Sequence, residues 1–135
     1  MMLCFYLIAI ACIMLFVALC IESANLKKCQ QSIPVRIGIT GTRGKSSVVR
    51  MIAAVLREHG IKTLGKTTGS RACLILPDGT DETIVRLGKP SIIEQKALIR
   101  KAAGLKCGAV VCEIMSVEKE YQDMESTRLL DITHC

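Results

Sequence analysis

The sequence has almost no aromatic side chains and no long block of like charge. Of its 135 residues none is Trp, two are Tyr and two are Phe, and only Tyr121 lies beyond the first sixteen positions. The 18 Lys and Arg are interleaved with 12 Asp and Glu, in runs of at most two. Single-strand binders stack bases on aromatic side chains, and nucleic-acid-binding tails are blocks of one charge. We therefore expect no nucleic-acid partner, and we attribute the net charge of +6 to a mixed surface with a few phosphate-binding cations.

Cysteine and histidine are present, but they lack the spacing of common metal and disulfide frameworks. Three of the eight cysteines, Cys4, Cys12 and Cys20, lie in an apolar N-terminal run, where a thiol serves as a small apolar side chain. No pair shows the two-residue separation that zinc sites prefer. We interpret the cysteines as reduced and structural in a cytosolic compartment, with metal binding as the alternative. His59 and His134 have no paired acid or nucleophile, and neither enters the mechanism.

The first residues predict a membrane anchor. Residues 1–21 carry no charged side chain, and a helix of that length reaches roughly 30 Å, the thickness of the hydrocarbon core of a bilayer. A cleaved signal peptide normally has a basic start and an apolar stretch of about 7 to 15 residues, and this run has neither. We therefore expect an uncleaved transmembrane anchor over residues 1–22, with a signal peptide as the alternative.

The charges after this run predict its orientation. Lys27, Lys28 and Arg36 follow the anchor, and positive residues mark the cytoplasmic side of a membrane span. We expect a single-pass protein of the cell membrane with its soluble part in the cytoplasm. Residues 23–33 are polar and aperiodic, which is typical of a juxtamembrane linker. The remaining residues, 34–135, have room for one small domain.

The order of signals in this domain predicts an α/β fold with a mostly parallel sheet and flanking helices of the P-loop type. The last residues, 131–135, resemble the start of another strand, so we expect the domain to be truncated. The predicted elements are a buried strand at 35–40, a glycine turn, an apolar-faced helix at 46–59, a strand at 61–66, a hairpin of 74–76 with 83–85, a helix at 92–103 begun by the capping box of Ser91 and Glu94 and closed by Gly104, a central parallel strand at 109–112 and a polar helix at 117–130.

A glycine turn between the first strand and its helix predicts a phosphate site. A helix N-terminus and the backbone N–H groups of such a turn favour phosphate oxygens. Lys45 would reach the β and γ phosphates, and Ser46 would place its hydroxyl on Mg²⁺. The strict P-loop pattern has a glycine where Ile39 stands, so a chance turn before a helix is the alternative. The candidate nucleotide-binding residues are Gly41, Thr42, Arg43, Gly44, Lys45, Ser46 and Ser47.

Two further places in the sequence are candidates for the same site. Glu113 ends the predicted central strand, at the sheet edge where α/β proteins bind ligands, and it could hold the metal directly or through water. The alternative is a solvated Glu at a strand end. Thr67 and Thr68 follow the second strand in a segment rich in hydroxyls and glycine. That segment suits a substrate pocket or a simple turn.

Several of these segments resemble a known family. Residues 39–47 are similar to the ATP loop of the Mur ligases, a superfamily that makes amide bonds in peptidoglycan precursors, folylpolyglutamate and capsule polymers. The Arg before Gly-Lys-Ser, together with residues 65–69, 93–96 and 112–117, looks most like one branch, the membrane-anchored ligase subunit of poly-γ-glutamate synthase. The apolar N-terminus fits that branch, because the peptidoglycan ligases lack it.

The resemblance implies an ATP- and Mg²⁺-dependent amide ligase that acts on glutamate or a polyglutamate chain through an acyl phosphate. It implies that Lys45 is catalytic, that Ser46 and Glu113 bind magnesium, and, more weakly, that Thr67 and Thr68 border the site. Other polyglutamate synthase subunits would be partners.

Family members continue for a few hundred more residues, so we expect this chain alone not to catalyse ligation. The rival interpretations are a membrane-anchored P-loop kinase or ATPase and a non-catalytic nucleotide-binding module.

Overall fold

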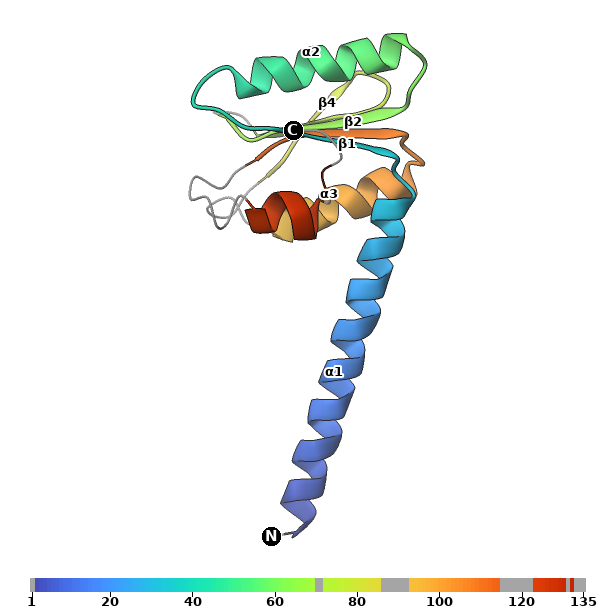
Figure 1. Cartoon of the computed structure of the whole chain (residues 1–135), viewed down its shortest axis with the longest axis vertical. Coiled ribbons are helices and arrows are strands. Elements are labelled where there is room, and N and C mark those ends of the chain that lie inside the picture. The colour runs from blue at the N-terminus through green and yellow to red at the C-terminus, as the bar shows by residue number, and fades with distance from the viewer. Residues whose placement is uncertain (1, 70–71, 86–92, 115–122, 131, 133–135) are drawn as a thin grey trace.

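The computed structural model describes residues 2–69, 72–85, 93–114, 123–130 and 132. A sheet lies between helix α2 on one face and helix α3 on the other, and the long helix α1 extends away from these layers (Figure 1). The elements are α1 (Met2–Gln31), β1 (Val35–Ile39), α2 (Lys45–Glu58), β2 (Thr63–Thr67), β3 (Cys73–Ile75), β4 (Asp81–Thr83), α3 (Ile93–Gly104), β5 (Ala109–Glu113) and the π-helical segment η1 (Met124–Leu129).

The sheet is mixed, which corrects the expected mostly parallel one. Its strand order is β1-β5-β2-β3-β4; β5 pairs in parallel with β1 and β2, whereas β3 pairs antiparallel with β2 and β4. The antiparallel half follows from the short connections, since a tight turn can only reverse the chain. In the β3–β4 turn, Asp78 Oδ1 accepts hydrogen bonds from the N–H and hydroxyl of Thr80, at 2.9 and 2.6 Å.

Strand β5 is the central strand of the parallel half, as its sequence predicts. All five of its residues are buried, because it has a neighbour on each side and a helix over each face. In register, Ile39 of β1 lies opposite Glu113, and Lys66 of β2 lies opposite Cys112. The carboxyl ends of three parallel strands therefore meet at one edge of the sheet, and the predicted glycine turn leaves β1 at that edge.

Side chains of β5 alternate between two apolar clusters. Val111 packs toward α2 with Val49, while Val110 and Cys112 pack with Leu98 on the α3 side. Burial raises the pKa of the Cys112 thiol to about 12, so the thiol stays protonated at neutral pH and serves as a small apolar side chain.

Helix α1 is longer than expected. It runs without a break to Gln31, so the expected linker at 23–33 is wrong over most of its length. The polar segment is helical because one side of it packs on the domain: Leu26 is 8% exposed and lies in the core cluster on the α3 side. Glu22 also pairs with Lys96 and Arg100 of α3, each at 3.2 Å.

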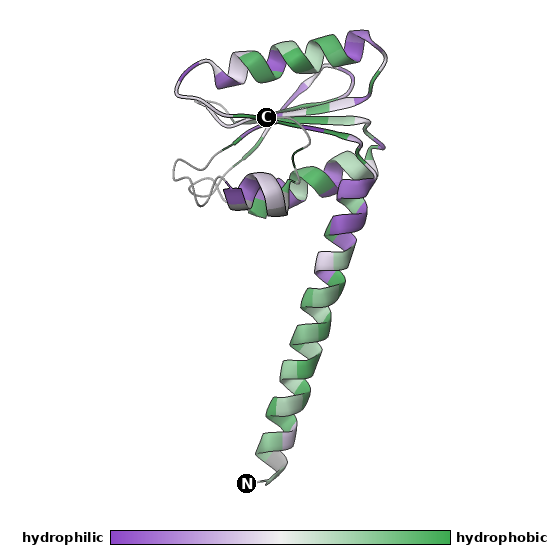
Figure 2. Cartoon of the chain, viewed as in Figure 1, coloured by the Kyte–Doolittle hydropathy of each residue, from purple (hydrophilic) through white to green (hydrophobic). Residues whose placement is uncertain are grey.

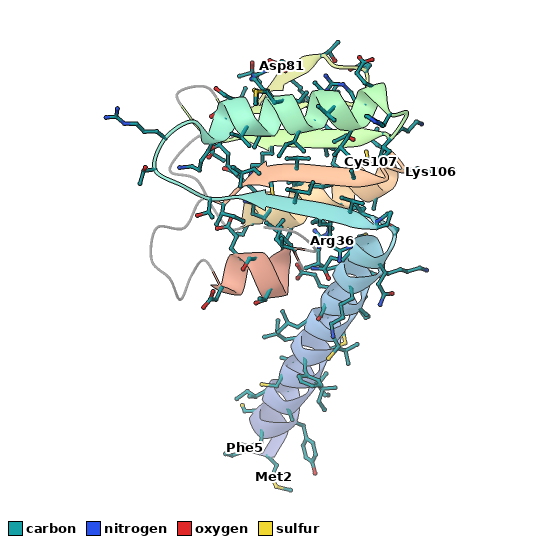
Figure 3. The ribbon with its side chains drawn as sticks, turned by 45° about the horizontal axis from the view of Figure 1, so that its top comes forward. Met2, Phe5, Arg36, Asp81, Lys106 and Cys107 are labelled. Carbon is teal, nitrogen blue, oxygen red and sulfur yellow. The ribbon has the colours of Figure 1, made fainter. Side chains whose placement is uncertain are left out.

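Arg36 does not act as a surface charge beside the anchor. It is buried where α1 meets β1 (Figure 3), and its guanidinium donates to the carbonyl oxygens of Gln30, at 2.7 Å, and Ile33. These are carbonyls at and just after the end of α1, which have no partner within the helix. Arg36 thus closes the helix and joins it to the sheet, while Lys27 and Lys28 are exposed.

Before Glu22, α1 extends away from the domain and is apolar on all its sides (Figure 2). Among the described residues, one helix, over Cys4–Gln31, is long and apolar enough to cross a membrane, and a signal sequence would meet the same test. Ser91 of the expected capping box, residues 117–122, His134 and Cys135 lie outside the described residues. The described part of the polar helix expected at 117–130 contains the π-helical segment η1 (Met124–Leu129).

Candidate functional site

The turn between β1 and α2 has the backbone shape that the glycine pattern suggests. Gly41 and Gly44 have φ angles of 140° and 78°, values that favour glycine. Gly44 is the residue before the first turn of α2, where it has no side chain to cap the helix. The first N–H groups of α2 are therefore directed to the open end of the helix, a position that favours an anion.

Lys45 folds back over this turn. Its Nζ donates a hydrogen bond of 2.7 Å to the carbonyl oxygen of Gly41. An ammonium group has three donors, so this bond leaves the cation able to contact a second group above the turn. The bond places the charge beside the N-terminus of α2, at the predicted phosphate position.

Glu113 joins three separate parts of the chain. Its side chain lies at the end of β5 and the residue is 1% exposed, so the interpretation of a solvated Glu is wrong. Oε1 accepts a hydrogen bond from the hydroxyl of Ser46, 67 positions away at the start of α2. Oε2 accepts one from the hydroxyl of Thr68, 45 positions away after β2. The fold thus brings together Ser46 and Glu113, the two residues proposed as metal ligands.

These groups line a cavity of about 370 Å³ at the carboxyl edge of the sheet. Gly41 contributes its carbonyl to Lys45, and Ser47 is exposed on the helix. Thr67 is buried within β2, with its hydroxyl 3.0 Å from Cys73 Sγ. None of these three lines the cavity. The lining residues are Thr42, Arg43, Gly44, Lys45, Ser46, Thr68, Gly69, Glu113 and Ile114.

Two residues of this region, Gly69 and Gln95, lie in segments that support the family resemblance, but the sequence gives neither of them a role. Gly69 lies so close to α2 that a Cβ on it would meet Ser46 Oγ at 3.0 Å. Gln95 of α3 lies beneath the strand end, where Nε2 donates to the carbonyl oxygen of Glu113 at 3.3 Å. The contacts of both residues depend on the packing of segments that are distant in the sequence.

The donor set suits a hard cation that also binds phosphate. Two hydroxyls and one carboxylate supply oxygen ligands, the type that Mg²⁺ prefers. Within the described residues, no group of three or more His, Cys, Asp and Glu could hold a metal without help. Phosphate and water oxygens would therefore have to complete the coordination of Mg²⁺ here, as is usual for this ion.

Comparison with known proteins identifies relatives of the chain, although no family model matches it. The capsule biosynthesis protein CapB of Bacillus anthracis is 38% identical over 110 residues, which cover 77% of this chain and 24% of that protein. PGA synthase CapB of Bacillus subtilis (strain 168) is 37% identical over 127 residues, which cover 93% of this chain and 32% of that protein.

The chain therefore spans about a quarter to a third of the curated relatives that it matches. Their names agree with the branch indicated by the motifs of the loop and the strand end. Over most of its length, the chain belongs to the CapB type of poly-γ-glutamate synthase subunit.

Proposed function

We propose that this chain carries the nucleotide-binding part of an ATP-dependent amide ligase that extends poly-γ-glutamate for a capsule or an extracellular polymer. The observation that carries the proposal is the convergence of Ser46, Thr68 and Glu113 beside Lys45, in one cavity at the end of the parallel strands. The names of the two CapB relatives support the same polymer.

The turn is proposed to bind the phosphates of ATP. The N–H groups at the start of α2 would donate hydrogen bonds to the phosphate oxygens, and Lys45 would move from the Gly41 carbonyl to the β and γ phosphates. The bond to Gly41 keeps the ammonium group beside the N-terminus of α2.

Ser46, Thr68 and Glu113 are proposed to hold Mg²⁺. When bound, the ion would neutralise charge on the β and γ phosphates. The two hydroxyls now donate to Glu113, and they would turn their lone pairs toward the cation instead. We therefore assign Thr68 to the metal site rather than to a substrate pocket, while a substrate role for Thr67 stays a prediction.

In the proposed reaction, the terminal carboxylate of a glutamate or polyglutamate chain takes the γ-phosphoryl group of ATP, and ADP leaves. The amine of an incoming glutamate then attacks the acyl carbon of this acyl phosphate, an amide bond forms, phosphate departs and the amine loses a proton. Lys45 and the N–H groups of the turn would contribute by positioning the phosphates and by stabilising their charge. Because the chain spans only part of its relatives, the whole reaction is proposed for the family's longer proteins.

Nucleotide binding is the direct test of the site. We expect the full chain, in detergent micelles, to bind a non-hydrolysable ATP analogue more tightly with Mg²⁺ than without it, as measured by calorimetry. Ser46→Ala should reduce the increase in nucleotide affinity that Mg²⁺ provides by about tenfold, the lower end of the affinity loss seen when a metal site is disturbed. Ser32→Ala is the matched control, because Ser32 is exposed and lies before β1, at the opposite end of that strand from the cavity, and binding should be unchanged. Failure of the unaltered chain to bind nucleotide would overturn the proposal.

A second measurement separates the ligase from its rivals. In membranes from cells that carry the gene in its natural context, with the other synthase subunits as partners, we expect ADP release to depend on added glutamate. A kinase or partition-type ATPase has no reason to respond to free glutamate. Nucleotide binding with no turnover in the same membranes would favour a docking module instead. We propose that α1 anchors the protein there, with the domain on the cytoplasmic side.

A further inference from the structure

A cluster of polar side chains lies buried on the α3 side of the sheet, away from the cavity. Lys66 is 1% exposed, and Gln95 and Glu125 are 0% exposed. Lys66 Nζ also lies 3.2 Å from a carboxylate oxygen of Glu94. Burial of such groups is costly unless they are hydrogen-bonded. A Leu in place of Gln95 would fill similar space without that cost, so the polar side chain calls for another explanation.

Gln95 is the residue that links this cluster to the sheet. Its Oε1 accepts a hydrogen bond from Lys66 Nζ of β2, at 3.2 Å. Its Nε2 donates to the carbonyl oxygen of Glu113 of β5, at 3.3 Å, and to Glu125 Oε1 of η1, at 2.5 Å. One amide group therefore bridges the ends of two neighbouring strands from below.

The bridge lies at the point where the two strands stop pairing. The last residue pair of β2 and β5 is Lys66 with Cys112. Two residues beyond Lys66, Thr68 donates its hydroxyl to Glu113, which follows Cys112, and both residues line the cavity on the α2 side. Beyond the last pair, no β-ladder between these strands holds the carboxylate at its distance from the hydroxyl. Gln95 contacts Lys66, two residues before Thr68, and the backbone carbonyl of Glu113 itself.

We propose that Gln95 is a positioning residue for the metal site: by joining Lys66 to the Glu113 carbonyl, it fixes the separation of Thr68 and Glu113 across the cavity. This role rests on the proposed function, because it concerns the binding of Mg²⁺ with nucleotide. It adds a residue on the opposite face of the sheet to those that touch the ligand. Gln95 itself contacts neither nucleotide nor metal.

The test compares nucleotide binding with and without Mg²⁺ in three variants of the full chain in micelles. Gln95→Met keeps the side-chain length and removes all three hydrogen bonds of the amide, and Gln95→Asn keeps the amide but is one methylene too short to bridge. Thr63→Val is the matched control. Thr63 is equally buried and bonds a backbone carbonyl, that of Ile61 at 2.9 Å, but at the opposite end of β2. Thermal unfolding is recorded for each variant.

Without Mg²⁺, we expect both Gln95 variants to bind ADP with an affinity within about twofold of that of the unaltered chain. The increase in ADP affinity on addition of Mg²⁺ should be smaller by about tenfold or more in these variants. Thr63→Val should lower the melting temperature but keep the full increase in ADP affinity with Mg²⁺. If Gln95→Met does not fold, Gln95→Asn decides alone. An unchanged Mg²⁺ gain in a folded Gln95 variant would overturn the positioning role and leave the proposed function standing. Absence of nucleotide binding by the unaltered chain would overturn both.

Discussion

At the scale of single residues, Gly69 controls how closely two segments of the cavity approach. The segment after β2 passes so near to α2 that a Cβ at this position would lie 3.0 Å from Ser46 Oγ, a distance tighter than most real Cβ contacts. That hydroxyl is not free to turn away, because it donates to Glu113. A side chain at Gly69 would therefore act on the proposed metal site directly.

We predict that Gly69→Ala weakens Mg²⁺-dependent nucleotide binding by about tenfold, since small displacements near a metal ligand have effects of this size. The Ser46 hydroxyl would have to move away from Glu113 to admit the new methyl group. Gly104→Ala is the control, because a Cβ there meets no atom within 4 Å. Calorimetry on both variants checks the prediction, and equal Mg²⁺ dependence in Gly69→Ala and the unaltered chain would contradict it.

Part of the site can be read from the sequence, and the reason is local. The strand, turn and helix around Lys45 are contiguous, and the end of a central strand makes Glu113 a candidate without knowledge of its partners. The contact of Thr68 with Glu113 and the bridge made by Gln95 depend on chain segments 45 and 18 positions from Glu113. No local pattern specifies such contacts, so Thr68 was assigned to substrate and Gln95 to no role.

At the scale of elements, the last turns of α1 belong to the soluble domain. Leu26 packs into the core cluster of the α3 side, and Arg36 closes the end of the helix. Hydropathy alone predicted a linker here, because the segment is polar on average. The packing of its one apolar face on α3 is a tertiary effect that a local average does not contain.

We predict that Leu26→Ala lowers the free energy of unfolding of the domain by about 2 to 3 kcal/mol, the usual loss for a buried Leu that leaves a cavity. Leu19→Ala in the same helix is the control, because Leu19 is exposed and packs on no part of the domain. Denaturant unfolding at constant detergent concentration measures both. Equal stability of the two variants would show that α1 is attached to the domain only as a tether.

The remaining elements follow the predicted order, because each is specified locally, by the hydrophobic periodicity of one segment or by the residues of one turn. The residues 74–76 and 83–85 predict a hairpin, and β3 and β4 form one, which adds an antiparallel half to the sheet. In the sheet, β5 lies between β1 and β2, so the free edge of β2 is the one that pairs with β3. That order is a property of the assembled sheet.

At the scale of the whole molecule, α1 presents an apolar surface with nothing in the described structure to cover it. The side chains of this surface are exposed as far as Ile21. In water such an area would be costly, at roughly 25 cal/mol for each Å². The cost disappears if the helix lies in lipid.

We predict that the full chain stays in the membrane fraction after extraction with alkaline carbonate. Leu15→Arg should shift chain into the soluble fraction, since a charge near the centre of a span costs about 2.5 to 3.5 kcal/mol. Gln31→Arg, at the exposed end of the same helix, should have no effect. Fractionation with detection of the intact chain checks this. Recovery of a shortened protein without α1 would indicate a cleaved signal sequence instead.

The unbroken path from α1 into β1 has a mechanical consequence. The strands run across the direction of α1, and α3 lies on the side toward its N-terminus (Figure 1). With no hinge between helix and sheet among the described residues, a span fixed in a bilayer would hold the cavity at a constant height, opening sideways along the membrane surface. A nucleotide would then reach the proposed phosphate site by moving parallel to the lipid plane rather than toward it.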